Sequence, residues 1–189
     1  MRVKAFLIGA LIALVLQTGA LAKIVYDHRS LLVNGEEVIL ETGFVDPRDI
    51  FRGHYVTLRL LISNPERDKV DLIGSFDYRD PVFMVLEKGE GPFWEAASLH
   101  ETYPNDAKGP VIRGAASFSS TSLENNSSAN PRISFPFDRY FAPELKAKEL
   151  ENLRQDRKLG VILSLGEDGE GLIKGITIGG EPIYEETLF

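Results

Sequence analysis

The residues best suited to chemistry are acids that stand beside arginines in two short segments. A paired carboxylic acid could act as a general acid or base. The same side chains could instead cap turns and form ion pairs that fix two corners of a β-fold, and we favour this structural role. The residues are Asp46, Arg48, Asp49 and Arg52 in the first segment and Asp138, Arg139 and Glu144 in the second.

Other patterns that would indicate catalysis or metal binding are missing from the sequence. His28, His54 and His100 are far apart and lack a metal-type spacing such as His-x-x-x-His. There is no Gly-x-Ser-x-Gly motif of an α/β-hydrolase. The glycine-rich segment 166–180 lacks the Gly-Lys-Ser/Thr of a phosphate-binding loop, and hairpin turns account for its glycines. We therefore assign no catalytic residue, no metal site and no cofactor.

The first segment belongs to a stretch from Val45 to Leu60 that predicts a helical corner followed by a strand. Pro47 has a fixed φ and no N–H, which suits the first position of a helical turn, and Asp46 can cap that turn. Gly53 then ends the turn, since glycine tolerates a positive φ. Residues 55–60 alternate between polar and apolar side chains, which predicts a half-buried strand.

The same stretch resembles the signature of the GDYXXLXY family of small bacterial proteins. The family pattern has a DPRD run, then Arg-Gly-Asp-Tyr, then a leucine beyond a spacer pair. A second block, residues 138–144 with 149–151 after it, resembles the family's later (E/D)RYFxPE block. His54 and Leu60 depart from the pattern, which has Asp and Tyr at these positions. The matching positions are Asp46, Pro47, Arg48, Asp49, Arg52, Gly53, Tyr55 and Leu58 in the first block and Arg139, Tyr140, Phe141, Pro143 and Glu144 in the second.

Composition excludes several classes of protein. The 189 residues fit one domain with appendages, and 43% hydrophobic residues support a core. There is no cysteine, which excludes disulfides and thiolate metal sites. The net charge is −7, and Arg2 and Lys4 give residues 1–22 a charge of +2, so residues 23–189 carry −9. This acidity argues against nucleic acid and against docking on anionic lipid.

The N-terminal segment predicts export. Residues 5–22 are uncharged and follow Arg2 and Lys4. About 20 apolar residues span a bilayer, and the apolar residues 24–26 extend the run, so we favour a retained transmembrane signal-anchor over residues 1–26. Ala20-Leu21-Ala22 is also a possible signal-peptidase site, which would release residues 23–189 into the periplasm. The basic start places the N-terminus in the cytoplasm and the domain, residues 27–189, outside it.

The rest of the chain predicts a mainly β (α+β) fold, a barrel or sandwich with one flanking helix, preceded by the transmembrane helix. Pro143 to Asp156 is the expected soluble helix, and residues 119–130 are the expected polar loop. Residues 70–76 are compatible with a strand or a loop. The expected strands are 36–44, with Val38, Leu40 and Thr42 on one face, and 55–60, 82–87, 93–100, 111–118, 132–137, 159–165 and 172–178.

The resemblance implies a function beside a membrane partner, because family members are generally encoded next to polytopic membrane proteins. We therefore expect a bacterial inner-membrane protein with one span, whose periplasmic domain is an accessory or interaction domain. The alternatives are an envelope hydrolase that uses carboxylates of the two blocks and a small-ligand-binding barrel. Tyr55, Tyr140 and Phe141 could belong to a binding surface, although we favour packing in the core or at its rim for them. We also expect the two blocks to meet in space.

Overall fold

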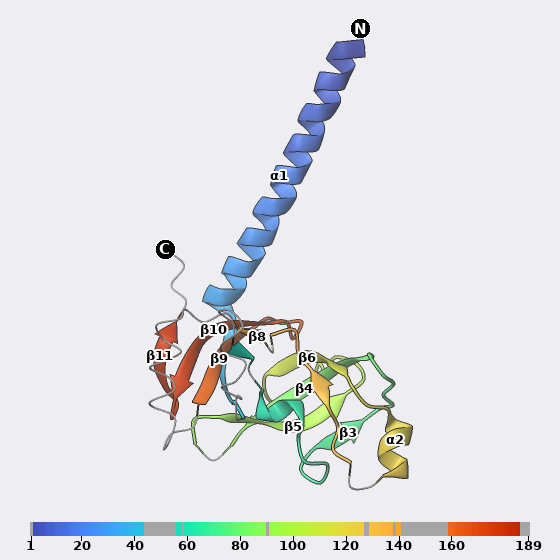
Figure 1. The fold of residues 1–189 in the computed structure, drawn as a ribbon, viewed down its shortest axis with the longest axis vertical. Coiled ribbons are helices and arrows are strands. Elements are labelled where there is room, and N and C mark those ends of the chain that lie inside the picture. Colours follow the sequence, from blue (N-terminus) through green and yellow to red (C-terminus); the bar gives the residue numbers. More distant parts are fainter. Residues whose placement is uncertain are drawn as a thin grey trace.

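A computed structural model shows a long N-terminal helix attached to a curled half-barrel of β-strands (Figure 1). This confirms the predicted fold class. The structure describes residues 2–43, 56–57, 59–89, 91–126, 129–137, 139–140 and 159–185. The predicted helical corner around Pro47, Gly53 and the predicted helix from Pro143 to Asp156 lie outside the described residues.

The N-terminal helix α1, Arg2–Asn34, has 33 residues and continues past Tyr26, where we expected the anchor to end. Alanine and leucine favour the helix, and the segment has no proline. Its section Phe6–Asn34 is long and apolar enough to cross a membrane, a criterion that a signal sequence also meets. No side chain is buried in the most apolar 18 residues of this section. The helix ends at the Asn34-Gly35 pair, where the Gly35 N–H donates to the Leu31 carbonyl oxygen at 2.9 Å.

Nine strands form the main sheet in the order β11-β10-β9-β1-β5-β4-β6-β7, with β3 pairing to β5 beside this path. Their bounds are β1 Glu36–Glu41, β3 Asp71–Ile73, β4 Pro81–Lys88, β5 Trp94–His100, β6 Val111–Ala116, β7 Ile133–Ser134, β9 Leu159–Leu165, β10 Gly171–Ile178 and β11 Glu181–Glu185. Two hairpins, β4–β5 and β9–β10, are antiparallel, and the second contains the glycine-rich turn predicted from the sequence. A short 3₁₀ helix, Leu61–Ser63, follows the bridge between Thr42 and Leu60.

Two contacts curl the sheet on itself. Strand β5 pairs in parallel with β1 through Leu40 and Trp94, and it pairs with β3 at its other end. The tip of the β9–β10 hairpin reaches β6, where the Arg113 N–H donates to the Gly169 carbonyl oxygen at 2.8 Å. Gly169 has a φ of +79°, which glycine adopts without strain. The backbone of the β9–β10 turn is therefore joined to β6, from which β9 is separated by three strands in the sheet order.

The core fills the concave side of the sheet. Val38, Leu40 and Thr42 are all buried on one face of β1, as the alternation predicted. On β9, Leu163 is fully buried opposite Val38 of β1 and Ile173 of β10. One continuous hydrophobic cluster contains these side chains together with those of the β4–β5 and β6–β7 region.

Two predictions about local structure were wrong. Residues 119–130 were expected to be a loop, but Ser120–Asn125 form the helix α2, which lies at the far end of the domain from α1 (Figure 1). The Ser119 hydroxyl caps α2 by accepting from the Ser122 N–H at 3.2 Å, and Leu123 is buried in the core. The strand expected over 132–137 is limited to Ile133–Ser134 in the ladder, since Pro136 has no N–H to continue it.

Candidate functional site

The structure describes only a short piece of each sequence block, and these two pieces lie side by side. β2, Val56–Thr57, pairs antiparallel with β8, Arg139–Tyr140, and these strands form a separate two-stranded sheet. Val56 stands opposite Tyr140, and Thr57 stands opposite Arg139. For these four residues, the pairing agrees with the expectation that the blocks meet.

Most of the predicted site residues fall outside the described residues, and their roles stay predictions. Arg139 and Tyr140 are placed by the backbone pairing of β8. The others are Asp46, Pro47, Arg48, Asp49, Arg52, Gly53, Tyr55, Leu58, Phe141, Pro143 and Glu144, together with the carboxylate of Asp138.

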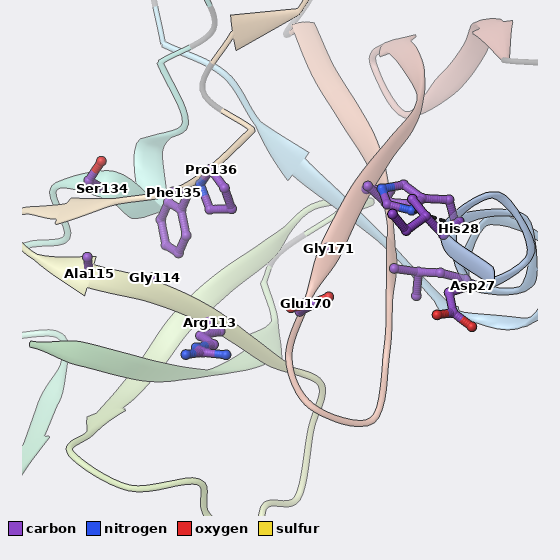
Figure 2. Close-up of a pocket in the computed structure, with 13 residues that line it drawn as sticks. Asp27, His28, Arg113, Gly114, Ala115, Ser134, Phe135, Pro136, Glu170 and Gly171 are labelled. Atoms are coloured by element: carbon purple, nitrogen blue, oxygen red, sulfur yellow. Dashed lines mark hydrogen bonds between the residues drawn. The ribbon is translucent and has the colours of Figure 1, made fainter. Parts of the chain in front are cut away.

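A cavity of about 790 Å³, which we call the foot cavity, opens between the C-terminal end of α1 and the sheet (Figure 2). Its walls combine apolar side chains with four that can carry charge. The lining residues are Ile24, Asp27, His28 and Leu31 of α1, Arg113, Gly114 and Ala115 of β6, Ser134, Phe135 and Pro136 at β7, and Glu170, Gly171 and Leu172 at β10.

Two glycines shape the floor of the foot cavity. A Cβ on Gly114 would lie 3.0 Å from the Phe135 ring, and a Cβ on Gly171 would lie 3.1 Å from the Phe137 ring. Without these Cβ atoms the two rings pack directly on the strands, stacked with centroids 5.5 Å apart. The Phe135 ring therefore contributes a close-packed apolar surface to the cavity wall, and both rings are buried.

The helix wall of the cavity is fixed to the sheet by a polar clamp. The Leu31 carbonyl oxygen, near the end of α1, accepts from the Ser164 hydroxyl at 2.6 Å and from the Gly35 N–H at 2.9 Å. Ser164 lies on β9 and is fully buried. The last carbonyls of a helix lack partners within it, so this clamp satisfies one of them and sets where α1 meets the domain.

Some of the ionisable side chains around the foot cavity have an ion-pair or hydrogen-bond partner, and others have none among the described residues. Asp27 forms an ion pair with Lys23 at 2.5 Å, and the His28 Nδ1 atom lies 3.0 Å from the Ile24 carbonyl oxygen. In the described part of the chain, the Arg113 guanidinium and the Glu170 carboxylate, both exposed, make no ion pair or side-chain hydrogen bond. Figure 2 shows these two side chains across the cavity from α1. One cation and one anion are thus available on the sheet side.

A second pair of side chains that could take part in a reaction lies on β5. The Ser98 hydroxyl and the His100 Nε2 atom lie 2.9 Å apart, in a groove of about 550 Å³ that Asp71, Trp94 and Asp106 also line. A serine beside an imidazole is the beginning of a nucleophilic site. Such a site also needs a group that orients the imidazole and donors for an oxyanion, and no hydrogen bond among the described residues supplies the first.

Within the described residues, no three His, Asp or Glu side chains are grouped to hold a metal ion. The Lys69 ammonium donates a hydrogen bond to the Glu66 carboxylate at 2.8 Å, and this bond raises the pKa of Lys69. Both side chains are exposed in the loop before β3 and lie outside the foot cavity and the β5 groove.

Sequence reasoning missed the foot cavity because its residues come from four separate segments. The one available signal is Arg113, a charge in the middle of an otherwise apolar strand, Val111–Ala116. A lone charge in such a strand often marks an exposed edge, so the signal alone does not identify a cavity.

The described architecture defines a β half-barrel carried on an apolar helix that could cross a membrane. A family model with the description "GDYXXLXY protein" matches residues 17–176, so the chain belongs to the GDYXXLXY family. The predicted family is thereby confirmed. The match includes the second half of α1 as well as most of the sheet. No curated protein and no solved structure matches the chain.

Proposed function

We propose that this protein is a membrane-anchored accessory domain that faces the bacterial periplasm and works with a polytopic membrane protein. One observation carries the proposal: an exposed apolar helix of sufficient length to span a bilayer runs without a break into the domain. A helix with apolar side chains on all sides is stable only in an apolar surrounding, which a bilayer provides. Arg2 and Lys4 before the apolar run support a cytoplasmic N-terminus and a periplasmic domain.

The surface that we propose for the partner is formed by the two family blocks. Their described strands, Val56–Thr57 and Arg139–Tyr140, pair directly, which supports a surface shared by the two blocks. The arginines and acids of the blocks, such as Arg48 and Glu144, would give this surface polar contacts that fix orientation.

Membrane extraction tests the anchor. We expect the full-length chain to stay with the membranes after a carbonate wash, because residues 5–22 carry no charge. A variant with Leu11→Arg and Leu14→Arg should move to the supernatant, since each arginine near the centre of a span costs about 3 kcal/mol. Recovery of the unaltered chain in the soluble fraction, beginning at Lys23, would identify a cleaved signal and contradict the anchor.

Crosslinking tests the partner. Proteins crosslinked to the full chain in intact membranes should include one protein with several spans, identified by mass spectrometry after solubilisation. Arg48→Ala and Glu144→Ala should each reduce its capture, while Arg67→Ala and Glu124→Ala, exposed sites outside both blocks, should not. If the first two variants fold and capture the same protein to the same extent, the blocks are scaffold and the proposed docking surface is wrong.

A further inference from the structure

The foot cavity begins where the apolar part of α1 ends. A hydrocarbon core of about 30 Å takes up about 20 helical residues, so a span that starts near Ala5 ends near Lys23. The α1 residues on the cavity wall run from Ile24 to Leu31, within about 12 Å of that point along the helix axis. The headgroup layer extends about 6 Å beyond the hydrocarbon core. The upper part of the cavity therefore lies at headgroup depth.

The cavity offers an apolar wall on the membrane side and two opposite charges on the sheet side. Ile24, Leu31 and Leu172 supply apolar surface that continues the apolar side of α1. Arg113 and Glu170 supply a cation and an anion that are free of ion pairs with other described residues. The volume of about 790 Å³ is within the range of sites for small ligands. A ligand that fits is amphiphilic and carries both signs of charge in its head.

We propose that the foot cavity binds the headgroup of a phospholipid with a phosphoethanolamine head, drawn from the bilayer that the anchor crosses. The phosphate is held by Arg113, whose planar guanidinium can donate two hydrogen bonds to it. The primary ammonium donates to the Glu170 carboxylate. The acyl chains leave past Ile24 along α1 into the bilayer. This inference rests on the proposed membrane anchor.

The charges of the cavity distinguish this head from those of other phospholipids. A lipid whose head carries only a negative charge would place that charge beside Glu170 and Asp27 without an ammonium to offset them. A choline head has no N–H to donate to Glu170, and quaternary ammonium groups are bound by several aromatic faces. Among the described residues of the cavity wall, Phe135 is the one phenylalanine, tyrosine or tryptophan, and it is buried.

Native mass spectrometry of the full chain tests this site. The protein is released from detergent micelles in the presence of equimolar phosphatidylethanolamine, phosphatidylglycerol and phosphatidylcholine. We expect one bound phosphatidylethanolamine, about tenfold more abundant than either competitor, as one charge-assisted hydrogen bond can provide. Glu170→Gln should remove most of this preference, because it removes the acceptor for the primary ammonium. Arg113→Gln should reduce the amount of all three lipids bound, because all three carry the phosphate.

Matched controls separate the site from the surface charge of the domain. Arg67→Gln and Glu124→Gln remove the same charges at exposed positions outside the cavity and should retain the preference. Three outcomes overturn the proposal: equal binding of the three lipids, the same preference in Glu170→Gln as in Glu124→Gln, or the same amount of bound lipid in Arg113→Gln as in Arg67→Gln. Loss of the anchor is a separate result, because carbonate extraction reports it without reference to lipid type.

Discussion

Replacing Leu163 by alanine should lower the free energy of unfolding by about 2–5 kcal/mol, the cost of a large-to-small change in a close-packed core. Leu163 has no exposed surface and lies on the central strand β9, opposite Val38 and Ile173. The loss should appear as a lower midpoint in urea unfolding of the full chain in detergent. Trp94, the only tryptophan, lies on β5, so its fluorescence reports on the domain and not on α1.

Leu61→Ala is the control for this change. The Leu61 side chain belongs to the 3₁₀ helix and is 51% exposed, so its truncation should alter the free energy of unfolding by about 0.5 kcal/mol or less. Equal losses from the two variants would mean that the strands β1, β9 and β10 do not enclose Leu163 as described.

Replacing Gly35 by valine should destabilise the domain by about 3 kcal/mol and loosen the junction with α1. A Cβ at this position would lie 2.6 Å from the Leu31 carbonyl oxygen and 2.9 Å from that of Leu165, and it would also collide with the Ser164 hydroxyl. Two of these three atoms belong to the backbone and cannot move aside without breaking the clamp. Urea unfolding followed by Trp94 fluorescence measures the loss.

Gly19→Val provides the matched control, because a Cβ on this α1 glycine meets no atom within 4 Å. Its unfolding midpoint should equal that of the unaltered chain. An unchanged midpoint for Gly35→Val as well would show that the α1–β1 junction has room for a side chain and is not held by the Leu31 clamp.

The sequence predicts those parts of the fold that depend on local patterns. Alternation on β1 and the hairpins β4–β5 and β9–β10 follow from side chains and turn residues that are close in the chain. The parallel contacts of β5 with β1 and β3 do not, because parallel partners are distant in sequence and depend on the packing of the whole sheet. The helix α2 was missed because one buried residue, Leu123, is too few to show a helical period.

Of the two candidate sites, one could be recognised from the sequence and the other could not. The motif blocks are recognisable in the sequence, and the pairing of β2 with β8 joins them in the part that is described. The foot cavity could not be predicted, since Arg113 and Glu170 become neighbours only when the β9–β10 hairpin tip bonds to β6. That contact is made by backbone atoms of Arg113 and Gly169, which leave no side-chain pattern.

The clamp at Leu31 has a mechanical consequence. Helix α1 and strand β1 are separated by Gly35 alone, and the Ser164 hydroxyl and the Gly35 N–H hold the end of the helix to the sheet. No flexible linker therefore absorbs motion between the bilayer and the domain. If the helix tilts, the half-barrel moves with it as one body. If the helix turns about its axis, a different side of the half-barrel faces a neighbouring protein. In the proposed membrane complex, a partner that binds α1 alone would thereby set the orientation of the domain.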